Sequence, residues 1–296
     1  MLEDHIKRRH HHVWQAYLQP WVTNGMIWCR HDRGDPFPTG TTVVAVERDF
    51  YKIQRLSDQD ALLLKTLVPE HLLFGDRYND LIQIFSDRHA STFTDSEKRS
   101  FEQWSSNLLE NYHAKIEASA IAFLNRARNG DITFYDKADT ALSFLHYLAA
   151  QWTRTKAARE GAVTRCKEID GVDLSRIWNV LAPHFALTSA THLFKRRRQM
   201  RLTILHNKHT DHPFTTGDQP VINLRATPGV LPGNNDLELY YPISPYRALL
   251  LYRTDDPPQI ATEDLSYEHV FTLNRKVYEA RHQQVFGLTR SSVTED

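Results

Sequence analysis

The sequence predicts an α+β fold: a mainly antiparallel sheet built from N- and C-terminal strands, with a large helical insertion between them. Two observations support this prediction. Aromatic and β-branched segments alternate with turn signals near both ends of the chain, and the middle shows the apolar spacing of helices. We therefore divide the chain into a discontinuous β-rich core domain, residues 1–56 and 200–296, and a helical lobe, residues 57–199.

The N-terminal strands are predicted on either side of a turn. Residues 26–30 are apolar and aromatic, which is typical of a strand. Residues 32–36 form a cluster of Asp, Gly and Pro that favours a turn. The β-branched residues 41–46 then predict the returning strand.

The middle of the chain is predicted to be helical. A leucine-rich helix is expected over residues 58–68. The sequence Thr-Asp-Ser-Glu at residues 94–97 is a capping box that predicts the start of a second helix, which should end at Asn129-Gly130. A further helix is expected over 138–159, and residues 174–205 begin as helix and end as strand.

The C-terminal part returns to β structure. Residues 214–224 predict a hairpin-like unit, in which Asp218 lies at the turn. Two strands are expected at 237–242 and 247–252, and a closing helix at 266–286.

The composition suits a soluble globular protein without an overall charge. Of the 296 residues, 41% are hydrophobic and 24% charged, and the 36 basic residues balance the 36 acidic ones. This balance argues against a surface generally coated by nucleic acid, although it permits a local basic patch. No run is long and apolar enough to span a bilayer, so we expect no membrane partner. Cys29 and Cys166 form no CxxC pair, which favours a reducing cytoplasm.

Several common enzyme classes lack their motifs here. The sequence contains no Walker A loop, GxGxxG, GxSxG or HExxH. P-loop ATPases, Rossmann dinucleotide enzymes, α/β hydrolases and zincins are therefore disfavoured.

Asp218, in the turn Thr-Gly-Asp-Gln-Pro, has two interpretations. An aspartate at such a turn commonly accepts hydrogen bonds from its own backbone, which is a structural role. A carboxylate projecting from the end of a sheet also suits a metal ion or a general base.

Three polar residues of the helical lobe form a second candidate group. Glu117 lies on an amphipathic helix, where a buried carboxylate needs a partner. Gln151 and Arg154 are three positions apart and share a helix face, and Arg154 is the natural partner of Glu117. The group is either a buried structural ion pair or the lining of an active site in which Arg154 holds an anion.

The histidines are candidate metal ligands. His10 and His11 are adjacent, so both reach one ion only in a loop or at a helix start. The alternative is a solvated basic stretch at the chain end. His206, His209 and His212 follow at a spacing of three, but Pro213 weakens a helical metal site there.

A basic cluster near residue 198 is a candidate nucleic-acid contact, or else a solvated helix face with Phe194 and Met200 turned inward. Its members are Lys195, Arg196, Arg197, Arg198 and Arg201.

These blocks together resemble a bacterial family, domain-of-unknown-function family 4238, over nearly the whole chain. The family's His-His-Tyr-Val-Pro-Gln-Phe-Tyr-Leu is similar to residues 10–18, and its Asp-Phe-Tyr to residues 49–51. Its Gln-x-x-Arg-Thr is similar to residues 151–155, its Phe-Ile-Thr-Ser-Asp-Asn-Pro-Val to residues 214–221, and its Pro-Leu-Ser-Pro to residues 242–245. Trp14, Gly217 and Gln219 depart from these patterns. The resemblance implies a role in anti-phage defence, as for some members, and nucleases are a frequent type of effector.

Two hypotheses follow. In the first, the chain is a cytoplasmic metal-dependent hydrolase or nuclease, with a divalent metal ion of unassigned identity and nucleic acid as partner. Its metal residues would be His10, His11 and Asp218; its catalytic residues Gln15, Glu117, Gln151, Arg154 and Asp218.

In the second hypothesis the chain is a non-enzymatic sensor or interaction protein, whose partner is a phage component. The motif residues would then be structural and lie apart. The sequence leaves a homo-oligomer open under either hypothesis. A nucleotide-modifying transferase is a third hypothesis, but the sequence contains no motif that marks a nucleotide-binding site. The geometric prediction is that the blocks around His10, Glu117, Arg154 and Asp218 meet across a shared sheet.

Overall fold

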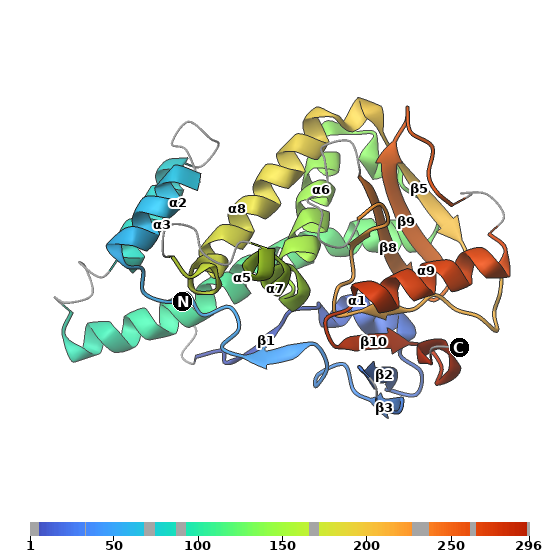
Figure 1. The fold of residues 1–296 in the computed structure, drawn as a ribbon, viewed down its shortest axis with the longest axis horizontal. Coiled ribbons are helices and arrows are strands. Elements are labelled where there is room, and N and C mark those ends of the chain that lie inside the picture. Colours follow the sequence, from blue (N-terminus) through green and yellow to red (C-terminus); the bar gives the residue numbers. More distant parts are fainter. Residues whose placement is uncertain are drawn as a thin grey trace.

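The computed structural model describes most of the chain (Figure 1). The described parts are residues 6–32, 34–67, 75–86, 93–165, 172–226, 237–260 and 265–294. Cys166 lies outside them. Within them the strands pair antiparallel in three sheets and the helices gather in the middle of the chain. The predicted α+β class is confirmed.

The first sheet joins two short N-terminal strands, β1 (Arg9–His11) and β4 (Val46–Arg48), with His10 opposite Glu47. Between them lie the helices α1 (Gln15–Leu18) and η1 (Gln19–Trp21). The strand predicted over 41–46 is wrong, because most of it forms turns and bends. Ala45 has a φ of 47°, a left-handed conformation that delays the strand until Val46.

The second sheet combines strands from both ends of the chain in the order β3-β2-β10-β6. These strands are β2 (Ile27–His31), β3 (Phe37–Thr39), β6 (Thr216–Gly217) and β10 (Gln284–Gly287). β10 pairs with β2 on one side and β6 on the other. The prediction that N- and C-terminal strands share a sheet is therefore confirmed.

The third sheet is C-terminal, in the order β5-β9-β8-β7. It contains β5 (Met200–His206), β7 (Ile222–Asn223), β8 (Glu238–Ser244) and β9 (Arg247–Arg253), so the strands predicted at 237–242 and 247–252 are confirmed. The hairpin predicted over 214–224 is wrong, because β6 and β7 pair with different sheets. Pro220 between them has no N–H to donate to a ladder.

Side-chain N-caps start two long helices of the insertion, at Thr94 and at Asp173. The described helices of the insertion are α2 (Asp58–Leu67), α3 (Gly75–Phe85), α5 (Asp95–Arg128), η2 (Thr133–Tyr135), α6 (Ala138–Thr153), α7 (Lys156–Arg165), α8 (Leu174–Lys195) and η3 (Arg197–Gln199).

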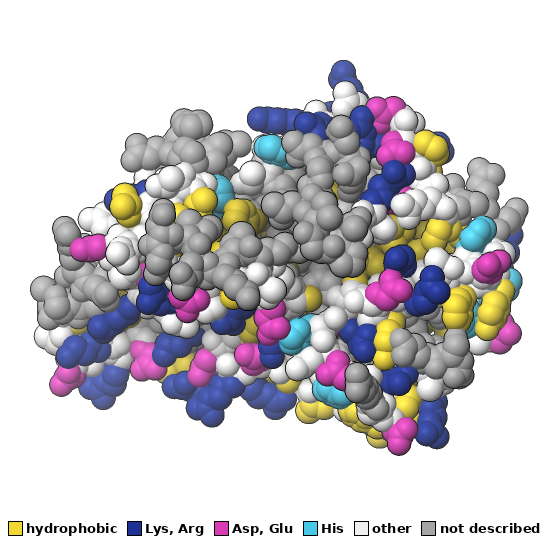
Figure 2. Space-filling model, viewed as in Figure 1, with side chains coloured by type: hydrophobic (Ala, Val, Ile, Leu, Met, Phe, Trp, Pro, Cys, Tyr) yellow, Lys and Arg dark blue, Asp and Glu magenta, His cyan; other side chains and the backbone are white. Residues whose placement is uncertain are grey.

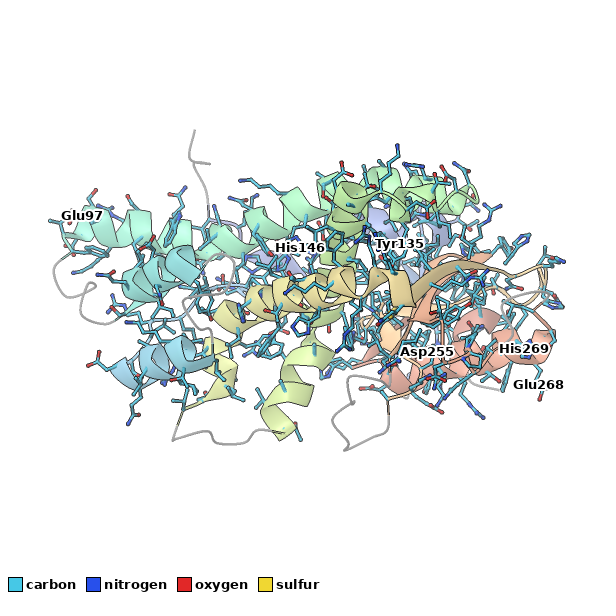
Figure 3. All side chains as sticks on the ribbon, turned by 90° about the horizontal axis from the view of Figure 1, so that it is seen from above. Glu97, Tyr135, His146, Asp255, Glu268 and His269 are labelled. Carbon is cyan, nitrogen blue, oxygen red and sulfur yellow. The ribbon has the colours of Figure 1, made fainter. Side chains whose placement is uncertain are left out.

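The capping box at the start of α5 is confirmed. The Thr94 hydroxyl accepts from the Glu97 N–H, and the Glu97 carboxylate accepts from the Thr94 N–H at 2.7 Å. Figure 3 shows Glu97 at the far end of this long helix. The single helix predicted over 138–159 is wrong, because α6 ends at Thr153 and α7 starts at Lys156. The break places Arg154 in a helix cap.

The closing helix is shorter than predicted. α9 (Tyr267–Ala280) ends before β10, so the helix expected to reach Phe286 is wrong in its last part. Residues 284–287 instead fill the gap between β2 and β6, where their backbone groups find ladder partners. The turn η4 (Ser291–Val293) follows.

The largest hydrophobic cluster joins the helices to the sheets. It contains Ala120 and Leu124 of α5, Phe144 and Leu148 of α6, and Leu249 of β9, among others. It therefore takes side chains from both predicted domains, and the domain division itself stays a prediction. Figure 1 shows α9 against the C-terminal sheet, onto which Val270, Leu273 and Val277 pack.

The surface carries mixed charges. Figure 2 shows Lys and Arg side chains interspersed with Asp and Glu over the lower part of the visible face, in keeping with equal numbers of basic and acidic residues. Among the described residues, no helix is long and apolar enough to cross a membrane.

Candidate functional site

A polar cavity of about 440 Å³ opens where the N-terminal segment meets α5 and the end of α6. We call it the polar cavity. It is lined by His11, Trp14, Gln15, Ala16, Gln19, Glu110, Glu117 and Arg154. Four of the predicted site residues, His11, Gln15, Glu117 and Arg154, are thus brought together from three segments distant in sequence.

Arg154 is the cation of the polar cavity. Its Nη1 donates to Glu117, its Nη2 to the His11 carbonyl oxygen at 2.5 Å, and its Nε to the Tyr51 hydroxyl at 2.8 Å. Burial lowers the pKa of Arg154, but the Glu117 carboxylate and Tyr51 raise it by more, so the guanidinium stays charged. The predicted Glu117–Arg154 ion pair is therefore confirmed, and it is almost completely buried.

Glu117 is held in place by this pair and by a neighbouring amide. Burial raises the pKa of Glu117, while the Arg154 guanidinium opposes that rise. Gln151, fully buried on α6, lies beside the carboxylate and also lowers its pKa, although its amide falls short of a hydrogen bond in this conformation. Gln151 therefore lies next to the Glu117 carboxylate and does not line the polar cavity.

Glu110 is a lining residue that the sequence analysis did not single out. Its Oε2 is buried and has no hydrogen-bond partner among the described residues. Burial raises the pKa of Glu110, Arg154 lowers it and Glu117 raises it further. The signal was present in the sequence, because Glu110 lies seven positions before Glu117 and two helical turns return to the same face.

His11 lines the polar cavity together with Glu110 and Glu117. Its Nε2 lies 2.8 Å from the Gln15 amide nitrogen and 3.2 Å from the Thr42 carbonyl oxygen. Burial lowers the pKa of His11, and Arg9 and Arg154 lower it further against the contrary effect of the Thr42 carbonyl. The ring is therefore neutral near neutral pH, and a neutral imidazole can accept a proton.

His10 points away from the polar cavity. Its Nδ1 accepts the Tyr51 N–H at 2.8 Å, and its Nε2 donates to the Lys7 carbonyl oxygen at 2.9 Å. The ring is fully buried, so the alternative of a solvated stretch is wrong for His10. Both ring nitrogens hydrogen-bond to backbone groups. His10 thereby holds Tyr51, whose ring lies beneath the Arg154 guanidinium.

Asp218 is also engaged by the backbone and does not line the polar cavity. Its Oδ1 accepts the His282 N–H at 2.8 Å, and its Oδ2 accepts those of Gln283 and Gln284 at 2.8 and 2.9 Å. Burial raises the pKa of Asp218, and these three donors oppose the rise. The role is structural, but the partners belong to residues 282–284, which lead into β10, and not to its own turn.

The turn at Asp218 nevertheless reaches the end of α6 through its neighbour. The Thr155 hydroxyl donates to the Gln219 Oε1, and the Gln219 Nε2 donates to the carbonyl oxygens of Val221 at 2.8 Å and Trp152 at 3.3 Å. The sequence blocks therefore lie close together, and Gln219 links the turn to the residue next to Arg154. The prediction that they meet across a shared sheet is wrong, because β1 and β6 belong to different sheets.

The described residues do not fit a metal ion at His10, His11 and Asp218. The ring nitrogens of His10 and the carboxylate oxygens of Asp218 already bind backbone groups. No group of three or more His, Cys, Asp or Glu within these parts of the chain is arranged to hold an ion. The divalent metal stays a prediction.

The basic cluster lies apart from the polar cavity. It extends from the end of α8 through η3 into β5. Thr153 contacts the Ala182 carbonyl oxygen, and Lys195 is thirteen positions further along α8, about 20 Å away. Arg197 stacks on Phe194 at 4.6 Å, and Met200 is buried as predicted.

The fold and the polar cavity define an α+β protein with ionisable side chains collected at a cavity between its N-terminal segment and its helical insertion. The chain belongs to the family described as Protein of unknown function (DUF4238), whose model matches residues 9–291. The resemblance seen in the sequence is thereby confirmed. No curated protein and no solved structure matches the chain.

Proposed function

We propose that this protein is a phosphoester hydrolase that acts on nucleic acid, with the polar cavity as its active site. The observation that supports the proposal is the collection of His11, Glu110, Glu117 and Arg154 at one cavity, with the pKa values of both carboxyls raised and that of the imidazole lowered. Paired shifts of this kind cluster at catalytic sites, because they keep an acid protonated and a base neutral near working pH.

His11 and Glu110 supply the proton transfers in this proposal. The neutral His11 imidazole takes a proton from water, whose oxygen attacks the phosphorus atom. Glu110, in the protonated form that burial favours, gives its proton to the leaving alkoxide oxygen as the P–O bond breaks. Arg154 stabilises the developing negative charge, and Gln15 orients the His11 ring. Glu117 and Tyr51 hold Arg154 in position, and the basic cluster attracts the polymer.

The cellular role that we propose is that of an anti-phage defence effector in the bacterial cytoplasm. The resemblance of the motif blocks to family 4238 supports the defence role. The buried free thiol of Cys29 suits a reducing compartment.

A second candidate is a non-enzymatic sensor of a phage component. It is favoured by the structural use of His10 and Asp218, whose polar atoms hold backbone groups and leave none for a reaction. Both candidates predict binding at the polar cavity, but only the first predicts bond cleavage.

The experiment is a cleavage assay with the full chain. Labelled single-stranded DNA, duplex DNA, RNA and bis(p-nitrophenyl) phosphate are incubated with the protein, each with EDTA, Mg²⁺ or Mn²⁺. Cleavage of any substrate that is lost in Arg154→Met supports the proposal, and the EDTA arm shows whether a metal takes part. The hydrolase proposal is contradicted if every substrate stays intact in every arm, also after phage lysate is added as a trigger. That result would favour the non-enzymatic sensor.

A further inference from the structure

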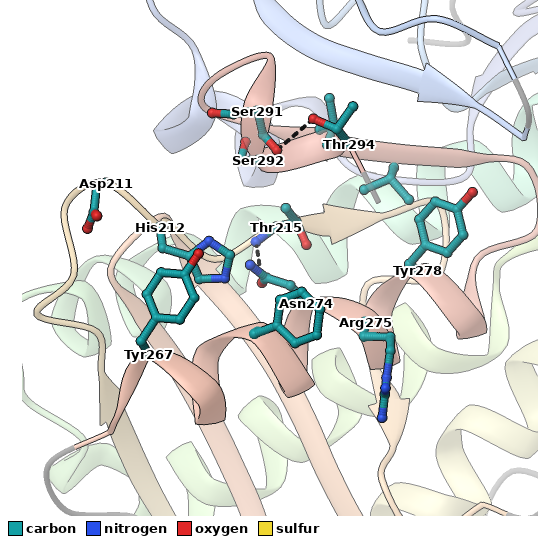
Figure 4. Close-up of a pocket in the computed structure, with 13 residues that line it drawn as sticks. Asp211, His212, Thr215, Tyr267, Asn274, Arg275, Tyr278, Ser291, Ser292 and Thr294 are labelled. Carbon is teal, nitrogen blue, oxygen red and sulfur yellow. Dashed lines mark hydrogen bonds between the residues drawn. The ribbon is translucent and has the colours of Figure 1, made fainter. Parts of the chain in front are cut away.

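A second cavity, of about 350 Å³, lies between one face of α9 and the C-terminal turn η4 (Figure 4). We call it the α9 cavity. It shares no lining residue with the polar cavity. Its lining residues are Asp211, His212, Thr215, Tyr267, Phe271, Asn274, Arg275, Tyr278, Val285 and residues 291–294.

One wall of the α9 cavity is a stack of aromatic rings. His212 lies parallel to Tyr267, with ring centroids 4.3 Å apart and planes 28° apart, and its centroid is 6.2 Å from that of Phe271. Figure 4 shows the His212 and Tyr267 rings together at one end of the cavity and Tyr278 at the other. Tyr267 is 51% exposed, so a ring face is open to a ligand. Flat aromatic ligands stack on such faces.

The floor of the α9 cavity contains polar atoms without partners. Thr215 is only 1% exposed, and its N–H donates to the Asn274 side chain at 2.9 Å, as the dashed line in Figure 4 marks. Its hydroxyl and the His212 Nε2 are both buried and have no hydrogen-bond partner among the described residues. Buried polar groups nearly always have a partner, so two at one cavity point to a ligand that supplies it.

The charges at the α9 cavity favour a neutral ligand. Asp211 and Arg275 have opposite signs, and the Arg275 Nε lies 3.6 Å from the Glu279 carboxylate. Burial lowers the pKa of His212, so its ring is neutral near neutral pH. The cavity therefore offers an aromatic stack, a hydroxyl and a neutral imidazole, without an excess of either charge.

We propose that the α9 cavity binds a nucleoside, with the base stacked on the exposed side chain of Tyr267 and its polar edge hydrogen-bonded to the Thr215 hydroxyl. A nucleobase is planar and carries donors and acceptors on its edge, which meets both requirements at once. The inference concerns a separate site and does not depend on hydrolysis at the polar cavity.

The test is calorimetric titration of the full chain with adenosine, guanosine, cytidine and uridine in turn. Binding of at least one nucleoside is expected. Tyr267→Leu removes the stacking face and should weaken binding about tenfold or more. Thr215→Val keeps the side-chain shape but removes the hydroxyl, and should weaken binding about fivefold. Phe185→Leu, at an exposed aromatic of α8 outside the cavity, should leave binding unchanged.

Three results would overturn the proposal. The first is the absence of binding by all four nucleosides at millimolar concentration. The second is binding that neither Tyr267→Leu nor Thr215→Val weakens while circular dichroism shows both variants folded. The third is equally tight binding of indole, which has the flat ring but not the polar edge. Cleavage assays of the same variants distinguish a failure of this proposal from a failure of the proposed hydrolase function, because neither Tyr267 nor Thr215 lines the polar cavity.

Discussion

A charge removed from water destabilises a protein unless an opposite charge meets it. Arg154 and Glu117 satisfy this condition, with exposed side-chain fractions of 2% and 10%. The pairing was predictable, because a carboxylate on an apolar helix face requires a partner. The hydrogen bond from Arg154 to the His11 carbonyl oxygen could not be predicted, because the residue types do not show where the backbone of the N-terminal segment runs.

Glu117→Gln should lower the free energy of unfolding by about 3 kcal/mol, because it leaves a buried guanidinium without a counter-charge. The double variant Glu117→Gln/Arg154→Met should lose less than the two single variants together. Urea unfolding of all three measures this coupling. The control is Glu279→Gln, which breaks an exposed pair with Lys276 and should change little. Additive single and double effects would show that the pair contributes no coupling.

At the scale of elements, Asp218 determines where α9 gives way to β10. Its carboxylate accepts three successive N–H groups between the helix end and the strand. The sequence predicted helix through this segment, because apolar spacing does not reveal that a carboxylate more than sixty residues earlier binds the backbone there. The capping box of α5 was predicted correctly because all of its atoms lie within four residues.

Asp218→Asn should therefore destabilise the fold by about 1 to 3 kcal/mol, because the amide accepts fewer of these hydrogen bonds. Hydrogen exchange of residues 282–284 should accelerate, while the activity of each folded molecule persists. Asp211→Asn, at an exposed loop position, is the matched control and should leave exchange there unchanged. A variant with wild-type stability and no activity would instead make Asp218 a catalytic residue.

At the scale of the whole molecule, the chain ends meet in one sheet and the helices pack onto it. The sequence predicted this arrangement from β composition at both ends. It did not predict three sheets, because residue types do not show that β6 pairs with β10 while β7 pairs with β8 in a separate sheet. The sequence also did not predict the polar cavity. Glu110 becomes one of its lining residues because α5 lies against the N-terminal segment, and the sequence does not show that contact.

Buried histidines make the stability of the whole fold depend on pH. Burial, helped by Arg154, lowers the pKa of His12 from 6.5 to about 3. The folded state thus binds fewer protons than the unfolded state, so this contribution is complete above the unfolded pKa and is lost as pH falls toward the folded pKa. From about pH 7 to about pH 5 the loss should be about 2 kcal/mol. His113, whose pKa burial also lowers, adds to it.

Urea unfolding at the two pH values measures this loss. His12→Phe should make stability less sensitive to pH, whereas His206→Phe, at an exposed position of β5, should retain the wild-type dependence. The raised pKa values of Glu110 and Glu117 act in the opposite direction, because carboxyls with raised folded pKa values contribute stability at low pH that is lost as pH rises. Equal pH dependence in wild type and His12→Phe would contradict the assignment of a neutral His12.

If the polar cavity hydrolyses phosphoesters, as we propose, the Glu110→Gln variant should cleave phosphodiesters more slowly than the wild type. Glutamine keeps the size of the side chain but has no proton to give to the leaving group. Its kcat should fall about 100-fold or more at unchanged thermal stability, while Glu268→Gln, exposed on α9, keeps the wild-type rate. A folded Glu110→Gln variant that cleaves as fast as the wild type would contradict this proposal.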